Sequence, residues 1–249
     1  MMGAKARKTV LWLACYLLLL LGSAPAQLLR FFVPPEMSIG SFSGSLWQGS
    51  LHQFAWRGFT LAEAHWQLTL SAWQPALRLE LRGAQEGMHG SGTLRGWLRP
   101  QLHDWQLSAP AEWVRQQLPL PLPITAQGQL QLRLQQGEFS PHGCVSLSGG
   151  SVNWQNAQLA TPLGELVLAN VQGQLSCDAK GALALVLKQD SAHVSLTGRG
   201  TVGVDGRYQF SGLLRSGPVL PESMKPLINQ LGRANAQGQY VWQLQGRYQ

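Results

Sequence analysis

Gly44-Ser45-Leu46-Trp47-Gln48-Gly49 sets the pattern on which the rest of the chain is built. Two glycines bracket an apolar pair, and the Gly-x-Leu step recurs from Gly92, Gly128, Gly173 and Gly212. Each copy leads into, or lies within, a stretch in which apolar and polar residues alternate. Glycine allows a positive φ in a tight turn or bulge, and the next leucine begins a buried face. We therefore expect short strands separated by glycine-containing turns.

The alternation of apolar and polar residues is typical of strands that bury one face. In Ala64 to Leu70 it places Trp66, Leu68 and Leu70 on one side, and Gln129 to Gln135 gives the cleanest repeat. Other expected strands are Leu77 to Arg82, Gly90 to Leu98, His103 to Leu107, Val145 to Trp154, Leu166 to Leu175, Leu183 to Leu187, Val194 to Thr197, Thr201 to Val204, Arg207 to Leu214 and Gln239 to Gln245. Asp205-Gly206 predicts a hairpin turn.

Two segments break this rhythm and predict short helices. Residues Ala111 to Leu118 follow Pro110 and carry Glu112 in the favourable first turn. Pro221 to Leu231 is the second segment, and Pro226 limits its length. About a dozen short strands and two brief helices indicate a mainly β fold, with a long antiparallel sheet that is curved or folded over on itself.

The N-terminal segment has the composition of a membrane anchor. Lys5, Arg7 and Lys8 precede an uncharged, strongly apolar run from Thr9 to Leu29. A helix over residues 10–29 is about long enough to cross a bilayer, and the basic flank keeps residues 1–9 in the cytoplasm. This organisation predicts a single-pass inner-membrane protein whose residues 30–249 form one periplasmic β-rich domain.

A cleaved signal peptide is the alternative interpretation of the same segment. Ala24-Pro25-Ala26 resembles a small-x-small cleavage site, and the apolar core is on the short side. Apolar character that continues through Leu28 and Leu29 favours the uncleaved anchor. Both interpretations export the residues from Arg30 onward.

Charge and site chemistry exclude several classes of function. Without Lys5, Arg7 and Lys8, the chain keeps 16 basic residues against 12 acidic ones, without a basic cluster of the kind that binds nucleic acid. The six histidines show no metal-ligand spacing. No nucleophile elbow, phosphate loop, dinucleotide fingerprint or acid/base pair is visible. We therefore expect no catalytic, cofactor or metal residues.

Three cysteines and ten tryptophans remain to be explained, and Cys15 lies within the apolar N-terminal run, where we expect it to be inert. Cys144 and Cys177 lie in the exported part, where an oxidising compartment favours a disulfide over two buried thiols. Val145 to Trp154 and Leu166 to Leu175 could pair around a loop at Gln155 to Gly164, which would bring the two cysteines together. Most tryptophans fall where a strand needs a large inward residue, although some could line an apolar groove or a partner surface.

The order of these features resembles the type II secretion system protein N (general secretion pathway protein N) family over essentially the full length. The resemblance rests on the basic start and apolar run, on Gly44, Leu46, Trp47 and Gly49, and on the two cysteine segments. Asp205-Gly206-Arg207-Tyr208 and the terminal strand from Gly238 to Gly246 complete it. The β-rich body also resembles AsmA-like proteins of the Gram-negative envelope, in which a curved sheet forms an apolar groove.

The resemblance implies an accessory inner-membrane component of a machine that moves folded proteins from the periplasm across the outer membrane. Its partners would be other subunits of that machine and the inner membrane, and neither family brings catalytic residues. A lipid-handling module, with acyl chains held by the sheet, is the alternative. No residues in the sequence support a third hypothesis, that the chain is a hydrolase.

Overall fold

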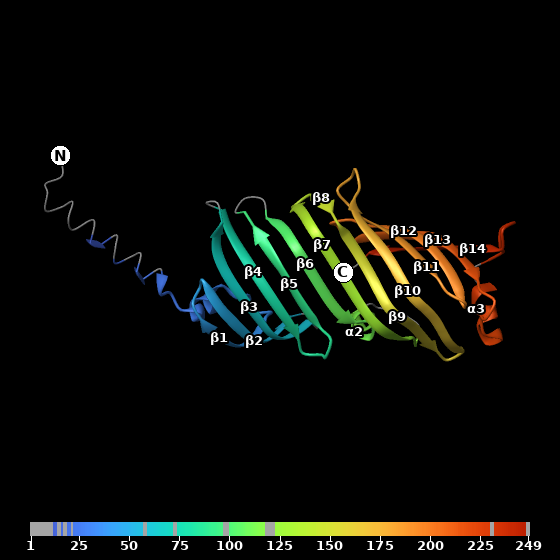
Figure 1. The fold of residues 1–249 in the computed structure, drawn as a ribbon, viewed down its shortest axis with the longest axis horizontal. Coiled ribbons are helices and arrows are strands. Elements are labelled where there is room, and N and C mark those ends of the chain that lie inside the picture. The colour runs from blue at the N-terminus through green and yellow to red at the C-terminus, as the bar shows by residue number, and fades with distance from the viewer. Residues whose placement is uncertain are drawn as a thin grey trace. The chain divides into compact units, whose positions relative to one another are not determined.

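The computed structural model describes residues 12–13, 16, 19–20, 22–56, 59–71, 74–96, 100–117, 123–229 and 232–247. Within these ranges the chain is mainly β with few helices, as the alternation predicted. It divides into two compact units, residues 1–84 and 85–249 (Figure 1).

The first unit is an antiparallel sheet whose strands follow one another in chain order. A 3-10 helix, η1 (Ala26–Phe32), precedes the strands β1 (Ser38–Gly44), β2 (Gln48–Trp56), β3 (Phe59–Ser71) and β4 (Gln74–Gly83). The register places Trp66 opposite Gly49 on one side and Leu79 on the other. Trp66 and Leu68 therefore share a face of β3, as their spacing predicted.

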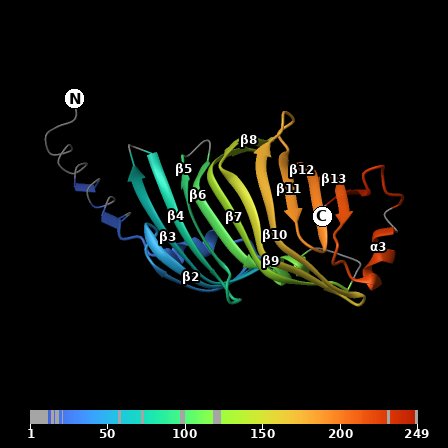
Figure 2. The same cartoon turned by 45° about the vertical axis from the view of Figure 1, so that its right-hand side comes forward.

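Among its described residues, the second unit contains ten strands that also pair antiparallel. They are β5 (His89–Arg95), β6 (Gln101–Pro110), β7 (Thr125–Ser140), β8 (Gly143–Ser148), β9 (Gly150–Thr161), β10 (Gly164–Cys177), β11 (Leu183–Asp190), β12 (Val194–Val202), β13 (Arg207–Ser216) and β14 (Gln239–Arg247). Neighbours in the sheet are neighbours in sequence, except that β9 follows β7 and the short β8 pairs with β7 outside this path (Figure 2).

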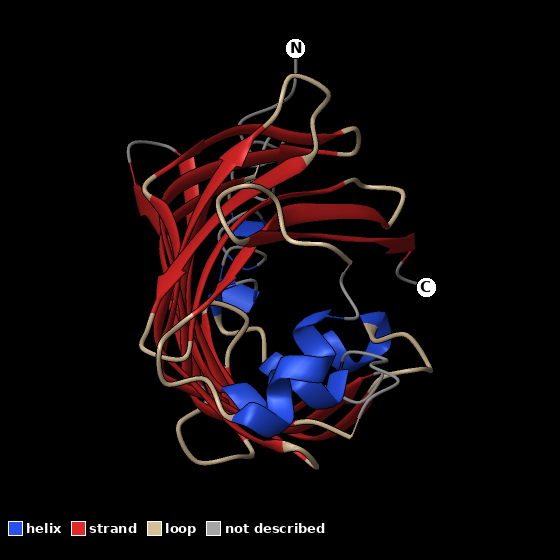
Figure 3. Ribbon diagram, turned by 90° about the vertical axis from the view of Figure 1, so that its right-hand side faces the viewer, coloured by secondary structure: helices blue, strands red, loops and turns tan. Residues whose placement is uncertain are grey.

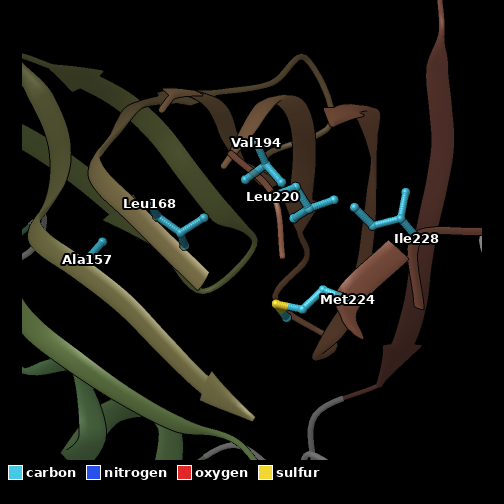
Figure 4. Close-up of a cluster of buried hydrophobic side chains, with 6 residues drawn as sticks. All are labelled: Ala157, Leu168, Val194, Leu220, Met224 and Ile228. Atoms are coloured by element: carbon cyan, nitrogen blue, oxygen red, sulfur yellow. The ribbon is translucent and has the colours of Figure 1, made fainter. Parts of the chain in front are cut away.

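Both predicted helices of the second unit are present. α2 (Ala111–Gln117) packs on β6 and β7, and η2 (Glu222–Met224) continues into α3 (Lys225–Asn229). These helices lie on one side of the sheet, which we call its inner face (Figure 3). Leu220, Met224 and Ile228 pack there on sheet residues Ala157, Leu168 and Val194 to form a small buried core (Figure 4).

The recurring glycines have two different roles, and the expectation that each marks a turn or bulge is wrong for two of them. Gly44 at the end of β1 and Gly128 at a bulge in β7 do adopt positive φ, at 86° and 100°. Gly92 lies at a register shift between β5 and β6, whereas Gly173 and Gly212 lie inside β10 and β13. A Cβ at Gly92 would overlap the Trp105 ring, so these strand glycines make room for large side chains of neighbouring strands.

The N-terminal segment differs from the expected helix over residues 10–29 at its C-terminal end. Residues 12–13, 16, 19–20 and 22 are helical, and the last helical bond runs from the Ser23 N–H to the Leu19 carbonyl at 3.0 Å. Pro25 then adopts an extended conformation, and η1 begins at Ala26. Across the parts of the chain that the structure describes, no helix is both long enough and apolar enough to cross a membrane. The other residues of the expected span lie outside these parts.

Candidate functional site

The motif from Gly44 to Gly49 forms the turn between β1 and β2. Its two glycines face each other as the last pair of the β1–β2 ladder. The Ser45 N–H donates to the Gln48 carbonyl at 2.8 Å, and the Ser45 hydroxyl accepts from the Gln48 N–H at 3.1 Å. The turn is thus closed by its own hydrogen bonds, which leaves the backbone of Leu46 and Trp47 available for other segments.

The N-terminal segment docks directly on this turn. Pro25 forms an antiparallel bridge with Ser45, and the Leu46 N–H donates to the Ala24 carbonyl at 3.0 Å. Ala26 is fully buried and Ala24 is 8% exposed. Small side chains at these two positions allow the segment to lie close against the sheet, so the segment resembling a cleavage site is part of the folded body. We call this contact the N-terminal joint.

Trp66 on β3 supports the turn from the other side. Its indole N–H donates to the Leu46 carbonyl at 3.1 Å, and its ring covers Gly49, where a Cβ would overlap it. Phe42 meets the ring edge-on with centroids 6.4 Å apart. The Leu68 N–H also donates to the Trp47 carbonyl at 2.6 Å. The motif residues Gly44, Leu46, Trp47 and Gly49 therefore form a structural joint, in which the glycines and the main chain make the contacts.

A row of polar side chains crosses the opposite face of β2 and β3. The Ser50 hydroxyl lies 3.2 Å from Nε2 of His52, whose Nδ1 lies 3.7 Å from the Glu63 carboxylate. This row was not visible in the sequence, because the β2–β3 register is needed to pair His52 with Glu63. Glu63 also contacts His65 at 2.9 Å and Arg82 at 3.7 Å.

The row has the atom order of a hydrolase triad but lacks its other requirements. Ser50 is 8% exposed, and its hydroxyl also lies 2.6 Å from the Ser43 hydroxyl. Ser50 lies in the middle strand of a paired set, so the neighbouring backbone N–H groups serve the sheet and do not form an oxyanion hole. The contacts fit a cross-strand polar ladder that stabilises the sheet.

Cys144 and Cys177 form a disulfide, with Cα atoms 5.5 Å apart. The bridge was expected, and part of the expected strand pairing is confirmed, because residues 150–154 pair antiparallel with residues 171–175. The two cysteines themselves lie outside that ladder: Cys144 is on β8, which pairs with β7, and Cys177 pairs with Leu183 on β11. Gly149, with φ of 60°, separates β8 from β9. Residues 155–161 continue β9, so only Pro162 and Leu163 form the turn to β10. The disulfide therefore ties the off-path strand β8 to β10.

The inner face of the second unit is apolar well beyond the small core. Register and alternation bring together residues of neighbouring strands that are only half-buried, including Leu132, Val152, Leu185, Leu187, Leu196 and Phe210. Leu185 and Leu187 face inward, while Val186 between them is 37% exposed on the outer face. Helices α2 and α3 cover parts of the inner face near the strand ends.

The aromatic residues contribute to both packing and partial exposure. Trp105 covers Gly92, Trp242 covers Gly212 and Gly198, and Phe210 covers Gly200. None of the tryptophans whose burial the structure describes is fully buried. In the described part of the chain, no group of three or more histidine, cysteine or acidic side chains could hold a metal ion.

The comparisons with known proteins all give the same family. A family model described as "Type II secretion system (T2SS), protein N" matches residues 35–243. A type II secretion system protein N from Pectobacterium carotovorum is 43% identical over 233 residues, 93% of each chain. One from Klebsiella pneumoniae is 39% identical over 94% of this chain and 93% of its own.

A more distant relative extends over the whole length. The type II secretion system protein N of Aeromonas hydrophila is 32% identical over 99% of this chain and 100% of its own. No solved structure matches the chain. The family model covers the motif turn and both disulfide cysteines, and on the basis of this match and of these relatives the chain belongs to the type II secretion system protein N family.

Proposed function

We propose that the chain is a non-enzymatic subunit of the type II secretion machinery, anchored in the cell inner membrane by its N-terminal segment. Its β-rich body stands in the periplasm and supports export of folded proteins across the outer membrane. The family supports a role in secretion, and the basic residues before the apolar run support the orientation.

The N-terminal joint is the observation that carries this proposal. Ala24 and Ala26 are buried against the turn at Ser45 and Leu46, so the N-terminal segment meets the sheet without a free linker. The sheet of the first unit is thus joined directly to the segment that contains the expected anchor. Such positioning suits a scaffold subunit, which acts by presenting surfaces to other subunits.

A reporter fusion tests the orientation. A periplasm-active reporter fused after Gln249 should be active, and a cytoplasm-only reporter at the same position should be silent. The opposite result would reverse the proposed topology.

Secretion assays test the role of the joint. In a strain that lacks its own protein N, the wild-type chain should restore release of a folded substrate into the medium. Ala26→Leu should reduce that release at equal membrane abundance, because the larger side chain cannot fit a fully buried site. Gln27→Leu, at the exposed neighbouring position, is the matched control and should restore secretion fully. Equal secretion by both variants would remove the joint from the mechanism.

Lipid handling is a second candidate function, favoured by the half-exposed apolar inner face. The backbone groups within the sheet are already paired there, so an occupant must bring few hydrogen-bonding groups of its own. An acyl chain satisfies this condition because it has none.

Two neighbouring positions on β11 separate lipid binding from general detergent carry-over. Leu185→Gln places a polar group on the inner face, and Val186→Gln places one on the outer face. If acyl chains occupy the inner face, phospholipid copurified per protein molecule should fall for Leu185→Gln alone. Equal phospholipid in both variants and wild type would count against this candidate.

A further inference from the structure

The outer edge of β14 is an unprotected strand edge. β14 pairs with β13 without a register shift, and no described strand pairs with its other edge. Natural proteins usually protect such edges with proline, lysine, other charges or bulges. From Gln239 to Gly246 the strand has none of these, and Arg247 is its one charged residue. At the start of the strand Asn235 bonds to both the N–H and the carbonyl of Gln239. From Val241 to Gly246 no described strand pairs with this edge, which can therefore accept another strand.

Both faces of β14 expose apolar side chains. Val241, on the outer face, is 51% exposed, and Leu244, on the inner face, is 50% exposed. A ligand lying on one face of the sheet would cover only one of them. A strand added at the edge places side chains beside both, because its residues alternate between the faces. Exposure of Val241 on one face and of Leu244 on the other therefore favours an added strand over a ligand on a single face.

Trp242 leans away from the free edge. Its ring lies over Gly212 on β13 and reaches Gly198 on β12, where an added Cβ would come within 3.0 Å of the ring. The side of Trp242 that faces the edge is thus left open for side chains of an incoming strand. Tyr240 is held by the core cluster next to α3, so the strand begins from a fixed position.

We propose that the occupant is a second copy of this chain, paired antiparallel through β14 with the two-fold axis at Gln243. In this register Trp242 of one copy lies opposite Leu244 of the other, and Val241 lies opposite Gln245. Tyr240, Trp242 and Leu244 are every second residue of β14 and share its inner face. In this register the inner faces of the two copies lie on the same side of the joined sheet. The two strands pair over residues 241–245, which carry no charge, so no like charges meet. This self-association goes beyond the secretion role and does not depend on it.

Cysteine crosslinking in native membranes tests the register. All variants use the full chain with Cys15→Ser, and Cys144 and Cys177 stay in their disulfide. Gln243→Cys lies on the axis opposite itself, so mild oxidation should double the apparent mass on a non-reducing gel. Gln209→Cys, an exposed glutamine one strand inward on the same face, should stay monomeric. Val241→Cys should crosslink only when it is mixed with Gln245→Cys.

A charge exchange at the axis provides the second measurement. Gln243→Lys and Gln243→Glu should each lower the dimer fraction, because like charges meet at the axis, and coexpression of the two should restore it. Failure of Gln243→Cys to dimerise would overturn the proposal, as would equal dimerisation of Gln209→Cys. A crosslink from Gln243→Cys to a protein of another size would also overturn it and would identify a heterologous strand at this edge.

Discussion

The backbone N–H of Leu46 donates a hydrogen bond of 3.0 Å to the carbonyl oxygen of Ala24, which joins the motif turn to the segment that precedes the sheet. The bond uses main-chain atoms on both sides, so its formation depends on how closely the segments approach. Small residues at positions 24 and 26 permit that approach, and Gly49 admits the Trp66 ring that supports the turn.

Ala26→Leu should open the N-terminal joint locally. Overpacking a fully buried site costs about 1–3 kcal/mol, which corresponds to roughly tenfold to hundredfold faster hydrogen exchange at a protected amide. The Leu46 amide is the one to follow by mass spectrometry, because it bonds to Ala24. Gln27→Leu should leave its exchange unchanged. Slow exchange in Ala26→Leu would mean that the segment does not hold the turn.

Gly92→Ala should destabilise the second unit, although alanine generally suits a strand better than glycine does. The nearest atoms to a new Cβ all belong to the Trp105 ring. We expect a loss of about 1–3 kcal/mol in denaturant unfolding of the purified chain. Ser91→Ala, at the exposed adjacent position, should change little. In a Trp105→Leu background, Gly92→Ala should lower the free energy of unfolding by less than it does in wild type. An equal loss in both backgrounds would contradict the ring-overlap explanation.

The strand pattern and both short helices could be predicted, because each depends on local alternation or on proline placement. The roles of the glycines could not be predicted. Gly128 and Gly92 each begin a copy of the same Gly-x-Leu pattern. Gly128 adopts a positive φ, whereas Gly92 lies under an aromatic ring. Only the residue opposite each glycine on the neighbouring strand distinguishes the two roles, and that residue is set by the register.

Replacing Cys144 or Cys177 with serine should lower stability by about 2–4 kcal/mol, since the bridge closes a loop between β8 and β10. The double variant should cost little more than either single one, because both changes remove the same link. Cys15→Ser serves as the control and should have no such effect. Full thiol labelling of positions 144 and 177 in the denatured, unreduced protein would show that the bridge does not form.

Glu112 should make stability depend on acid pH. The hydrogen bond from Arg115, and then that from the Ala126 N–H, hold the pKa of this carboxyl below its ordinary value of 4.5. A lowered folded pKa stabilises the fold above the ordinary value, and this contribution is lost as the pH falls through the folded pKa. Glu112→Gln should therefore be less stable than wild type at neutral pH. The difference between their free energies of unfolding should become smaller as the pH falls into the acid range. A difference in stability between Glu112→Gln and wild type that stays constant with pH would reject the ionic explanation.

The candidate site was predicted only in part. The motif and the cysteine pair were identified from their residues, but the contact between Ala24 and Leu46 needs a three-dimensional turn to bring distant segments together. The Ser50, His52 and Glu63 row likewise depends on the β2–β3 register. Composition indicated an apolar span through Leu29, whereas Pro25 ends the helix sooner and turns the chain onto the sheet.

The intact mass and N-terminal sequence of the mature protein, isolated from the inner-membrane fraction, test the central claim most directly. An anchor joined to the body predicts a chain that retains residues 10–26 and fractionates with the inner membrane. A mature chain that begins at Gln27 and is released with the periplasmic contents would contradict the account, because the segment that docks on Ser45 and Leu46 would then be absent.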